Sequence, residues 1–298
     1  MYKVLSILLK GVARLPFCVL YAVADVIFFV LYYIARYRRK AVRKNLQESF
    51  PEKTHKEIRA IERQFYRNFA DYIVETIKLL HISDEEMRRR MTFEGVEMID
   101  EILASGQSIA AYFSHCFNWE WAPSVTLWSR FTPDVDAAFC QVYRPLRSHT
   151  FDRLMLLVRS RFNPRSLPKQ TTLRALLTLR REGMPSITGF MSDQKPSHGD
   201  PTCVVRFLNH PTAMITGTET LARRLGMAAI YWDMEKTGRG HYRITCRMIS
   251  RDLSTLEPMA VTRTYARMLE ETIRRNPSIW LWSHKRWKWA VKMPDNEA

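Results

Sequence analysis

A histidine and a glutamate five positions apart stand in the stretch SHCFNWEW, which runs from Ser114 to Trp121. The histidine, His115, can take up a proton near neutral pH. A carboxylate such as that of Glu120, hydrogen-bonded to one ring nitrogen, would fix the tautomer and leave the other nitrogen as a proton acceptor. The pair therefore predicts a general base for a hydroxyl or an amine that attacks an activated carbonyl. No serine nucleophile is needed, because the bound acceptor itself attacks.

The spacing of this pair is weak evidence by itself. A chain with 8 histidines and 30 acidic residues among 298 positions is expected to show it about once by chance. It occurs a second time in His81 and Glu86, where Ser83 and Glu86 instead predict a helix capping box. Cys116 beside His115 suggests a cysteine hydrolase as an alternative. Neighbouring residues at a strand end point to opposite faces, however, and a small buried residue is the more ordinary role for a free cysteine.

The elements around His115 set it apart from His81. An apolar run predicts a buried strand over 108–115, and Asn118 is a possible cap of the helix that follows. Two more apolar runs predict strands over 134–143 and 185–194. Amphipathic helices lie between these strands, and two later strands flank a turn at 237–240. The pattern predicts an α/β fold with a mixed, largely parallel sheet flanked by helices.

Polar side chains follow two of the later strands in the same way. Arg144 comes directly after the second strand, and Asp193 and Gln194 end the third. In an open α/β sheet, ligands bind in the crevice at the carboxyl ends of the strands. We therefore expect His115, Arg144 and Asp193 to belong to one site.

The N-terminal part of the chain has a different pattern. From Leu15 to Ala35 the chain is apolar apart from Asp25, and about 20 apolar residues suffice to span a bilayer as a helix. Arginines and lysines follow from Arg36 to Lys44, and such charge favours the cytoplasmic side. We expect a membrane-anchoring helical segment over 1–45, spanning the bilayer or lying in its interface, and an α/β domain over 46–298. A buried helix of a soluble domain is the alternative that Asp25 supports.

Charge and cysteine content bound the function classes. The net charge is +16, so nucleic acid, an anionic membrane and an acidic protein are the candidate partners. The apolar N-terminal helix and the lack of a recognised nucleic-acid module argue against nucleic acid. The five cysteines are scattered and form no CxxC pair, which predicts a reducing compartment without a metal site or a disulfide framework.

Several motifs together carry a resemblance to a known family. HCFNWE, His115–Glu120, looks like the histidine-four-residues-acid motif of membrane acyltransferases. Its Asn-Trp-Glu form resembles the late acyltransferases of lipid A synthesis, the lauroyl and myristoyl transferases of Gram-negative bacteria. VYRPL, Val142–Leu146, and SDQ, Ser192–Gln194, resemble two further motifs of that family, and WLWSHKRWK, Trp280–Lys288, resembles its C-terminal ending. The likeness covers roughly residues 1–290. Asn209 departs from the pattern of the family, in which a glycine often follows a phenylalanine at this place in the chain.

The resemblance implies residue roles. His115 would be the base and Glu120 its orienter, in a direct attack without an acyl-enzyme. Arg144 would bind a phosphate of the acceptor or stabilise the developing oxyanion. Asp193 and Gln194 would orient Arg144 or contact the acceptor sugar. Two further residues of the first motif, Asn118 and Trp119, would contact substrate.

The resemblance also implies the reaction and its setting. A fatty acyl chain would move from an acyl thioester, on acyl carrier protein or coenzyme A, to a hydroxyl of a lipid A precursor, with no cofactor. Acyl carrier protein, membrane lipids and the lipid A precursor are the expected partners. The expected location is the bacterial inner membrane, with the active site on the cytoplasmic face. A lysophospholipid, a glycolipid or an aminolipid is an alternative acceptor for the same chemistry.

Overall fold

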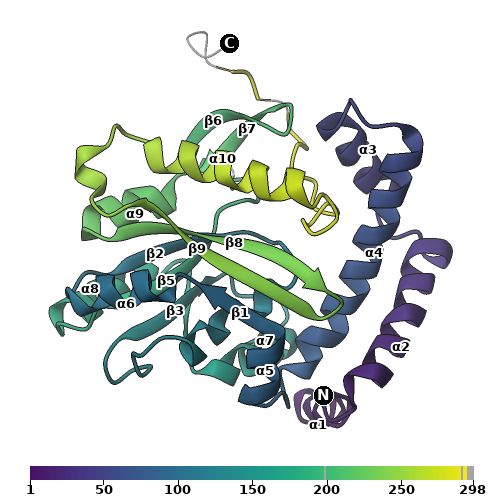
Figure 1. Ribbon diagram of the computed structural model, residues 1–298, viewed down its shortest axis with the longest axis horizontal. Helices are drawn as coiled ribbons and strands as arrows, with labels where there is room; N and C mark the ends of the chain where they lie inside the picture. The colour runs from purple at the N-terminus through teal and green to yellow at the C-terminus, as the bar shows by residue number, and fades with distance from the viewer. Residues whose placement is uncertain (198, 290, 294–298) are drawn as a thin grey trace.

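A seven-stranded sheet forms the centre of the protein, described here from a computed structural model over residues 1–197, 199–289 and 291–293 (Figure 1). The strands follow the order β1-β9-β8-β2-β5-β3-β4. β8 and β9 are antiparallel, and the other neighbours in this sheet are parallel. The predicted α/β class with a largely parallel sheet is confirmed. The strands are Met91–Glu94 (β1), Ile109–Phe113 (β2), Ala138–Tyr143 (β3), Arg165–Pro168 (β4), Ser186–Met191 (β5), Ala228–Gly238 (β8) and His241–Ser250 (β9).

The central strand β2 is apolar throughout because both of its faces are covered. All five residues of β2, IAAYF, are buried. Helix α10 packs on β8 and β9, and the separate hairpin β6–β7, Thr202–Phe207 and His210–Ile215, packs against α10 (Figure 1). The helices of this part of the chain are His55–Lys78 (α4), Asp84–Arg90 (α5), Val96–Ala104 (α6), His149–Arg159 (α7), Thr172–Arg181 (α8), Gly217–Leu225 (α9) and Ala260–Arg275 (α10), with short 3-10 helices at Trp119–Leu127, Ser160–Phe162 and Leu253–Thr255.

The N-terminal helices pack against α4, the longest helix (Figure 1). They are Tyr2–Ala13 (α1), Phe17–Phe29 (α2) and Arg39–Ser49 (α3). The ammonium group of Lys78, near the end of α4, donates to the carbonyls of Ala13 and Leu15 at the corner between α1 and α2, at 2.9 and 2.8 Å. The boundary expected after residue 45 lies inside α3.

The apolar segment expected near residues 15–35 is helical. α2 continues into a π-helical turn, Val30–Ile34, and the 18 residues from Phe17 to Ile34 are long and apolar enough to cross a membrane. Only 28% of this stretch is buried. One face packs on α4, and Val26 and Phe29 on the other face are 63% and 53% exposed. This exposure argues against the alternative of a buried core helix. Asp25 pairs with Arg239 at 2.7 Å, so its charge has a partner.

Candidate active site

The strand ends that carry the expected side chains lie next to one another. β5 stands between β2 and β3 in the sheet. The parallel register pairs Phe113 of β2 with Met191 of β5, so His115 and Asp193, each two residues further on, meet at the same edge. A cavity of about 450 Å³ opens there. Its polar lining comes from His115, Glu120, Gln141, Arg144, Arg159, Lys169 and Gln194, and its apolar lining includes Phe113, Trp119, Met155 and Met191.

Asp193 is the carboxylate that holds His115. Its Oδ1 lies 2.8 Å from His115 Nδ1, and its Oδ2 accepts hydrogen bonds from the His115 backbone N–H at 3.0 Å and from Trp280 Nε1 at 2.8 Å. Burial opposes the charge on Asp193, but the attraction of His115 and the hydrogen bonds outweigh it and lower the pKa of Asp193 to about 2. The ionised carboxylate therefore keeps the proton of the imidazole on Nδ1 and fixes the ring.

The second ring nitrogen of His115 lies at the cavity. With the proton on Nδ1, Nε2 carries a lone pair, and the side-chain amide of Gln194 donates to it at 3.1 Å. A hydroxyl that replaced this amide would be in place to give up its proton. The indole of Trp119 packs against the imidazole with ring centroids 5.1 Å apart. This is the geometry of a general base that is oriented on one side and available on the other.

Glu120 is engaged elsewhere, which corrects its predicted role. Its carboxylate forms a bidentate pair with Arg159 of α7, at 2.7 and 2.9 Å, and accepts from Trp119 Nε1 at 3.1 Å. The chain enters a 3-10 helix at Trp119, and this helix directs Glu120 towards α7 rather than back to His115. Asp193, and not Glu120, is therefore the carboxylate in contact with the His115 ring.

Arg159 is the site residue that sequence reasoning missed. In the sequence it stands near Arg161 and Arg165, in a basic run typical of a solvated surface. The structure separates the three, because Arg161 and Arg165 pair with Asp84 and Asp134 on the surface. The Arg159 side chain is 19% exposed and lines the cavity. Helical spacing is the sequence feature that could have indicated Arg159, because Met155 lies one helical turn before it and lines the same cavity.

The remaining expected residues divide into two groups. Trp119 and Arg144 line the cavity, and no hydrogen bond or ion pair joins Arg144 to another described side chain. Asp193 therefore does not orient Arg144. Asn118 caps the 3-10 helix as expected, accepting from the Glu120 backbone N–H at 3.2 Å. Asn118 is fully buried, so it is not accessible for the expected contact with substrate.

A comparison with protein-family models assigns the chain. The model described as the bacterial lipid A biosynthesis acyltransferase matches residues 3–289. The chain belongs to this family. It is therefore an acyltransferase, and lipid A precursors are the acceptor that fits the family. A search of the curated proteins returned no match.

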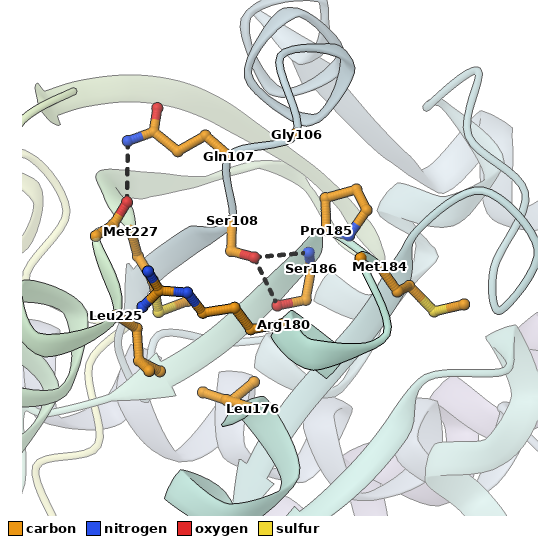
Figure 2. Close-up of a pocket in the computed structure, with 12 residues that line it drawn as sticks. Gly106, Gln107, Ser108, Leu176, Arg180, Met184, Pro185, Ser186, Leu225 and Met227 are labelled. Carbon is orange, nitrogen blue, oxygen red and sulfur yellow. Dashed lines mark hydrogen bonds between the residues drawn. The ribbon is translucent and has the colours of Figure 1, made fainter. Parts of the chain in front are cut away.

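Two other features of this lipid A acyltransferase family member lie outside the cavity. The Cys116 side chain is fully buried, and burial raises the pKa of its thiol, so Cys116 is unsuited to act as a nucleophile. A pocket of about 260 Å³ lies at the opposite ends of the strands, around Ser108 and Ser186 (Figure 2). It shares no residue with the cavity at His115. Among the described residues, no group of three or more His, Cys, Asp or Glu side chains could hold a metal ion.

Proposed function

We propose that the protein transfers a fatty acyl chain from an acyl thioester directly to a hydroxyl of a lipid A precursor, with His115 as the general base. The observation that carries this proposal is the His115–Asp193 pair, which places a lone pair on Nε2 at the wall of a cavity. Direct attack fits this site, because its neighbouring thiol, Cys116, is buried.

His115 alone can carry the proton from the acceptor hydroxyl to the leaving group. Nε2 takes the proton of the acceptor hydroxyl as the oxygen bonds to the thioester carbonyl carbon. The Asp193 carboxylate stabilises the imidazolium that forms. The tetrahedral intermediate collapses by breaking the carbon–sulfur bond, and the proton on Nε2 passes to the leaving thiolate. The products are an ester and a free thiol, and His115 returns to its starting state.

Arg159 and Arg144 supply the positive charge that this reaction needs. Glu120 holds the Arg159 guanidinium in one place at the cavity wall, which suits it to a developing oxyanion or a fixed phosphate of the acceptor. Arg144 is exposed and makes no hydrogen bond or ion pair with another described side chain, so it is available for a phosphate at the mouth of the cavity. Their different burial suggests different roles, with Arg159 acting on the reacting centre and Arg144 on binding.

We infer that acyl carrier protein is the donor's carrier and that the enzyme works on the cytoplasmic face of the inner membrane. The net charge of +16 suits an acidic carrier protein, and three exposed arginines, Arg144, Arg147 and Arg153, lie close together in the sequence, the first of them in the lining of the cavity. The exposed apolar face of α2 and the arginines from Arg36 onward suit a bilayer with an anionic surface.

The proposal is tested with His115→Ala in the detergent-solubilised full chain, assayed by mass spectrometry with acyl carrier protein thioester and a lipid A precursor. Loss of a general base is expected to lower kcat about 10²- to 10⁴-fold. His81→Ala is the matched control, because His81 has the same spacing to an acid but does not line the cavity. Near-normal transfer by His115→Ala would rule out this mechanism. Transfer to a lysophospholipid, a glycolipid or an aminolipid in preference to the lipid A precursor would keep the chemistry and change the acceptor.

A further inference from the structure

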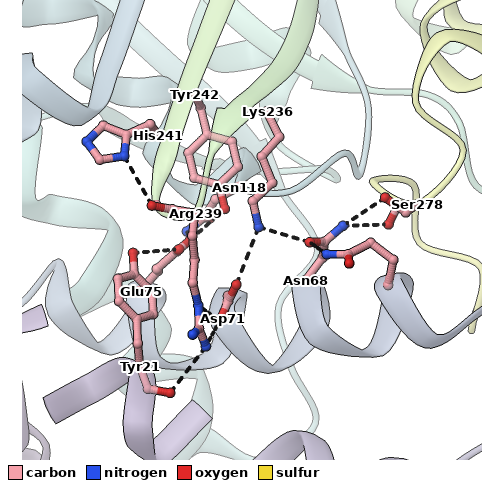
Figure 3. A network of polar contacts seen from close by, with 12 residues as sticks. Tyr21, Asn68, Asp71, Glu75, Asn118, Lys236, Arg239, His241, Tyr242 and Ser278 are labelled. Carbon is pink, nitrogen blue, oxygen red and sulfur yellow. Dashed lines mark hydrogen bonds and ion pairs between the residues drawn. The ribbon is translucent and has the colours of Figure 1, made fainter. Parts of the chain in front are cut away.

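Glu75 of α4 contacts the turn that carries His115 and Glu120, although it does not line the cavity. Its Oε2 accepts hydrogen bonds from Asn118 Nδ2 at 3.1 Å and from Tyr242 Oη at 2.9 Å. Its Oε1 accepts from Tyr21 Oη at 3.1 Å. Figure 3 shows this carboxylate amid polar side chains from α2, α4, β9 and the turn. Three donors from separate parts of the chain therefore share one acceptor group.

Glu75 holds the turn at a second point through its main chain. The backbone carbonyl of Glu75 accepts from Trp121 Nε1 at 3.2 Å. Asn118, the side-chain partner of Glu75, in turn accepts from the Glu120 backbone N–H. The contacts thus run from Glu75 through Asn118 to the start of the 3-10 helix, which sets where Glu120 meets Arg159.

The burial of Glu75 argues that its hydrogen bonds serve more than packing. Glu75 and Asn118 are both 0% exposed. Burial raises the pKa of Glu75, with the nearby Lys236 acting in the opposite direction. A buried carboxylate is costly, and an apolar residue of similar volume often stabilises a fold as well or better. Glu75 offers what such a residue lacks, which is directed acceptors that fix Asn118 in one orientation.

We propose that Glu75 is a positioning residue for acyl transfer, which acts through Asn118 to fix the turn between His115 and Glu120 and joins that turn to α2 through Tyr21. The inference rests on the proposed function, since it assumes that this turn carries the reacting groups. A small displacement of the turn would move both the base and the Glu120–Arg159 pair out of register with the substrate.

The first test compares Glu75→Met with Glu62→Met in the full chain. Glu62 is a matched control, because it is also fully buried on α4 and holds Arg39 and Arg43 without contacting the turn. Glu75→Met is expected to lower kcat about 10- to 100-fold with little change in KM, as a misplaced turn would. Glu62→Met is expected to lower Tm at least as much and to keep near-normal kcat. A kcat loss in Glu75→Met no larger than that in Glu62→Met would overturn the proposal.

The second test reverses the direction of the hydrogen bond between the two side chains and remains decisive if Glu75→Met fails to fold. Asn118→Asp sets a second carboxylate against Glu75, so kcat is expected to fall. Adding Glu75→Gln supplies an amide donor that faces the new carboxylate, and kcat is expected to recover together with Tm. A double variant that regains Tm but stays as inactive as Asn118→Asp would show that Glu75 has a structural role only.

The two proposals can fail separately. If His115→Ala is inactive and Glu75→Met keeps the kcat of its control, only the role of Glu75 is wrong. If His115→Ala keeps its activity, the proposed function is wrong, whatever Glu75→Met shows.

Discussion

Replacement of Asp193 by Asn tests the central geometry of the site. The substitution keeps the shape of the side chain but removes its charge and allows its amide to donate to His115 Nδ1. Such a donor favours the tautomer that carries its proton on Nε2, where the lone pair is needed. The Trp280 and backbone hydrogen bonds can still reach the remaining oxygen, so the fold has reason to persist.

The size of the effect follows from the electrostatics of the carboxylate. The pKa of Asp193 falls from 3.8 to about 2 in spite of full burial. That shift corresponds to roughly 2 kcal/mol of net stabilisation of the charged form. If all of it is available to the imidazolium that forms in the transition state, it amounts to roughly 30-fold in rate. The wrong tautomer adds to this loss, and the same exchange in a serine protease triad costs about 10⁴. We expect kcat to fall about 10²- to 10⁴-fold.

The assay measures kcat and KM against pH for Asp193→Asn and for Glu120→Gln, which carries an equal change in charge. Asp193→Asn is expected to alter the pH profile of kcat, because it changes the partner of the titrating base. Glu120→Gln is expected to weaken the hold on Arg159 and to lower kcat without altering that profile. A near-normal kcat for Asp193→Asn, or a pH profile that Glu120→Gln shifts and Asp193→Asn does not, would refute the assignment of Asp193 as the orienter.

Two further outcomes follow from the surroundings of the base. The lysine in Arg159→Lys cannot form the bidentate pair with Glu120. In steady-state assays, kcat is therefore expected to fall about 10- to 100-fold, with Tm nearly unchanged. A wild-type kcat in this variant would exclude Arg159 from the reacting centre. Burial lowers the pKa of His284 from its ordinary value of 6.5 to about 4. Between these two pH values the unfolded chain binds more protons than the folded chain, so the free energy of unfolding decreases as the pH falls from about 6.5 to 4. In thermal unfolding across this pH range, the Tm of His284→Gln should fall less steeply with decreasing pH than the Tm of the wild type. Equal slopes of Tm against pH would contradict the lowered pKa of His284.

The sequence predicted the position of the site better than its internal contacts. His115, Arg144 and Asp193 were expected together because each follows an apolar run, and the carboxyl ends of parallel strands meet at one edge of a sheet. Such runs are local signals. The short strands β1, β4 and β7 were missed. Each has only four to six residues of mixed polarity, and β7 begins with His-Pro, so none of them shows a clear periodicity.

The partners of His115 and Glu120 could not be read from spacing, because each depends on non-local packing. Asp193 reaches His115 across 78 residues, only because β5 lies beside β2 and pairs Phe113 with Met191. Had another strand taken that place, Asp193 would stand elsewhere with the same sequence around it. Glu120 reaches Arg159 because a 3-10 helix starts at Trp119 and α7 ends nearby. His115 and Glu120 therefore have two separate partners, Asp193 and Arg159, although they stand on one short turn, which contacts Glu75 through Asn118.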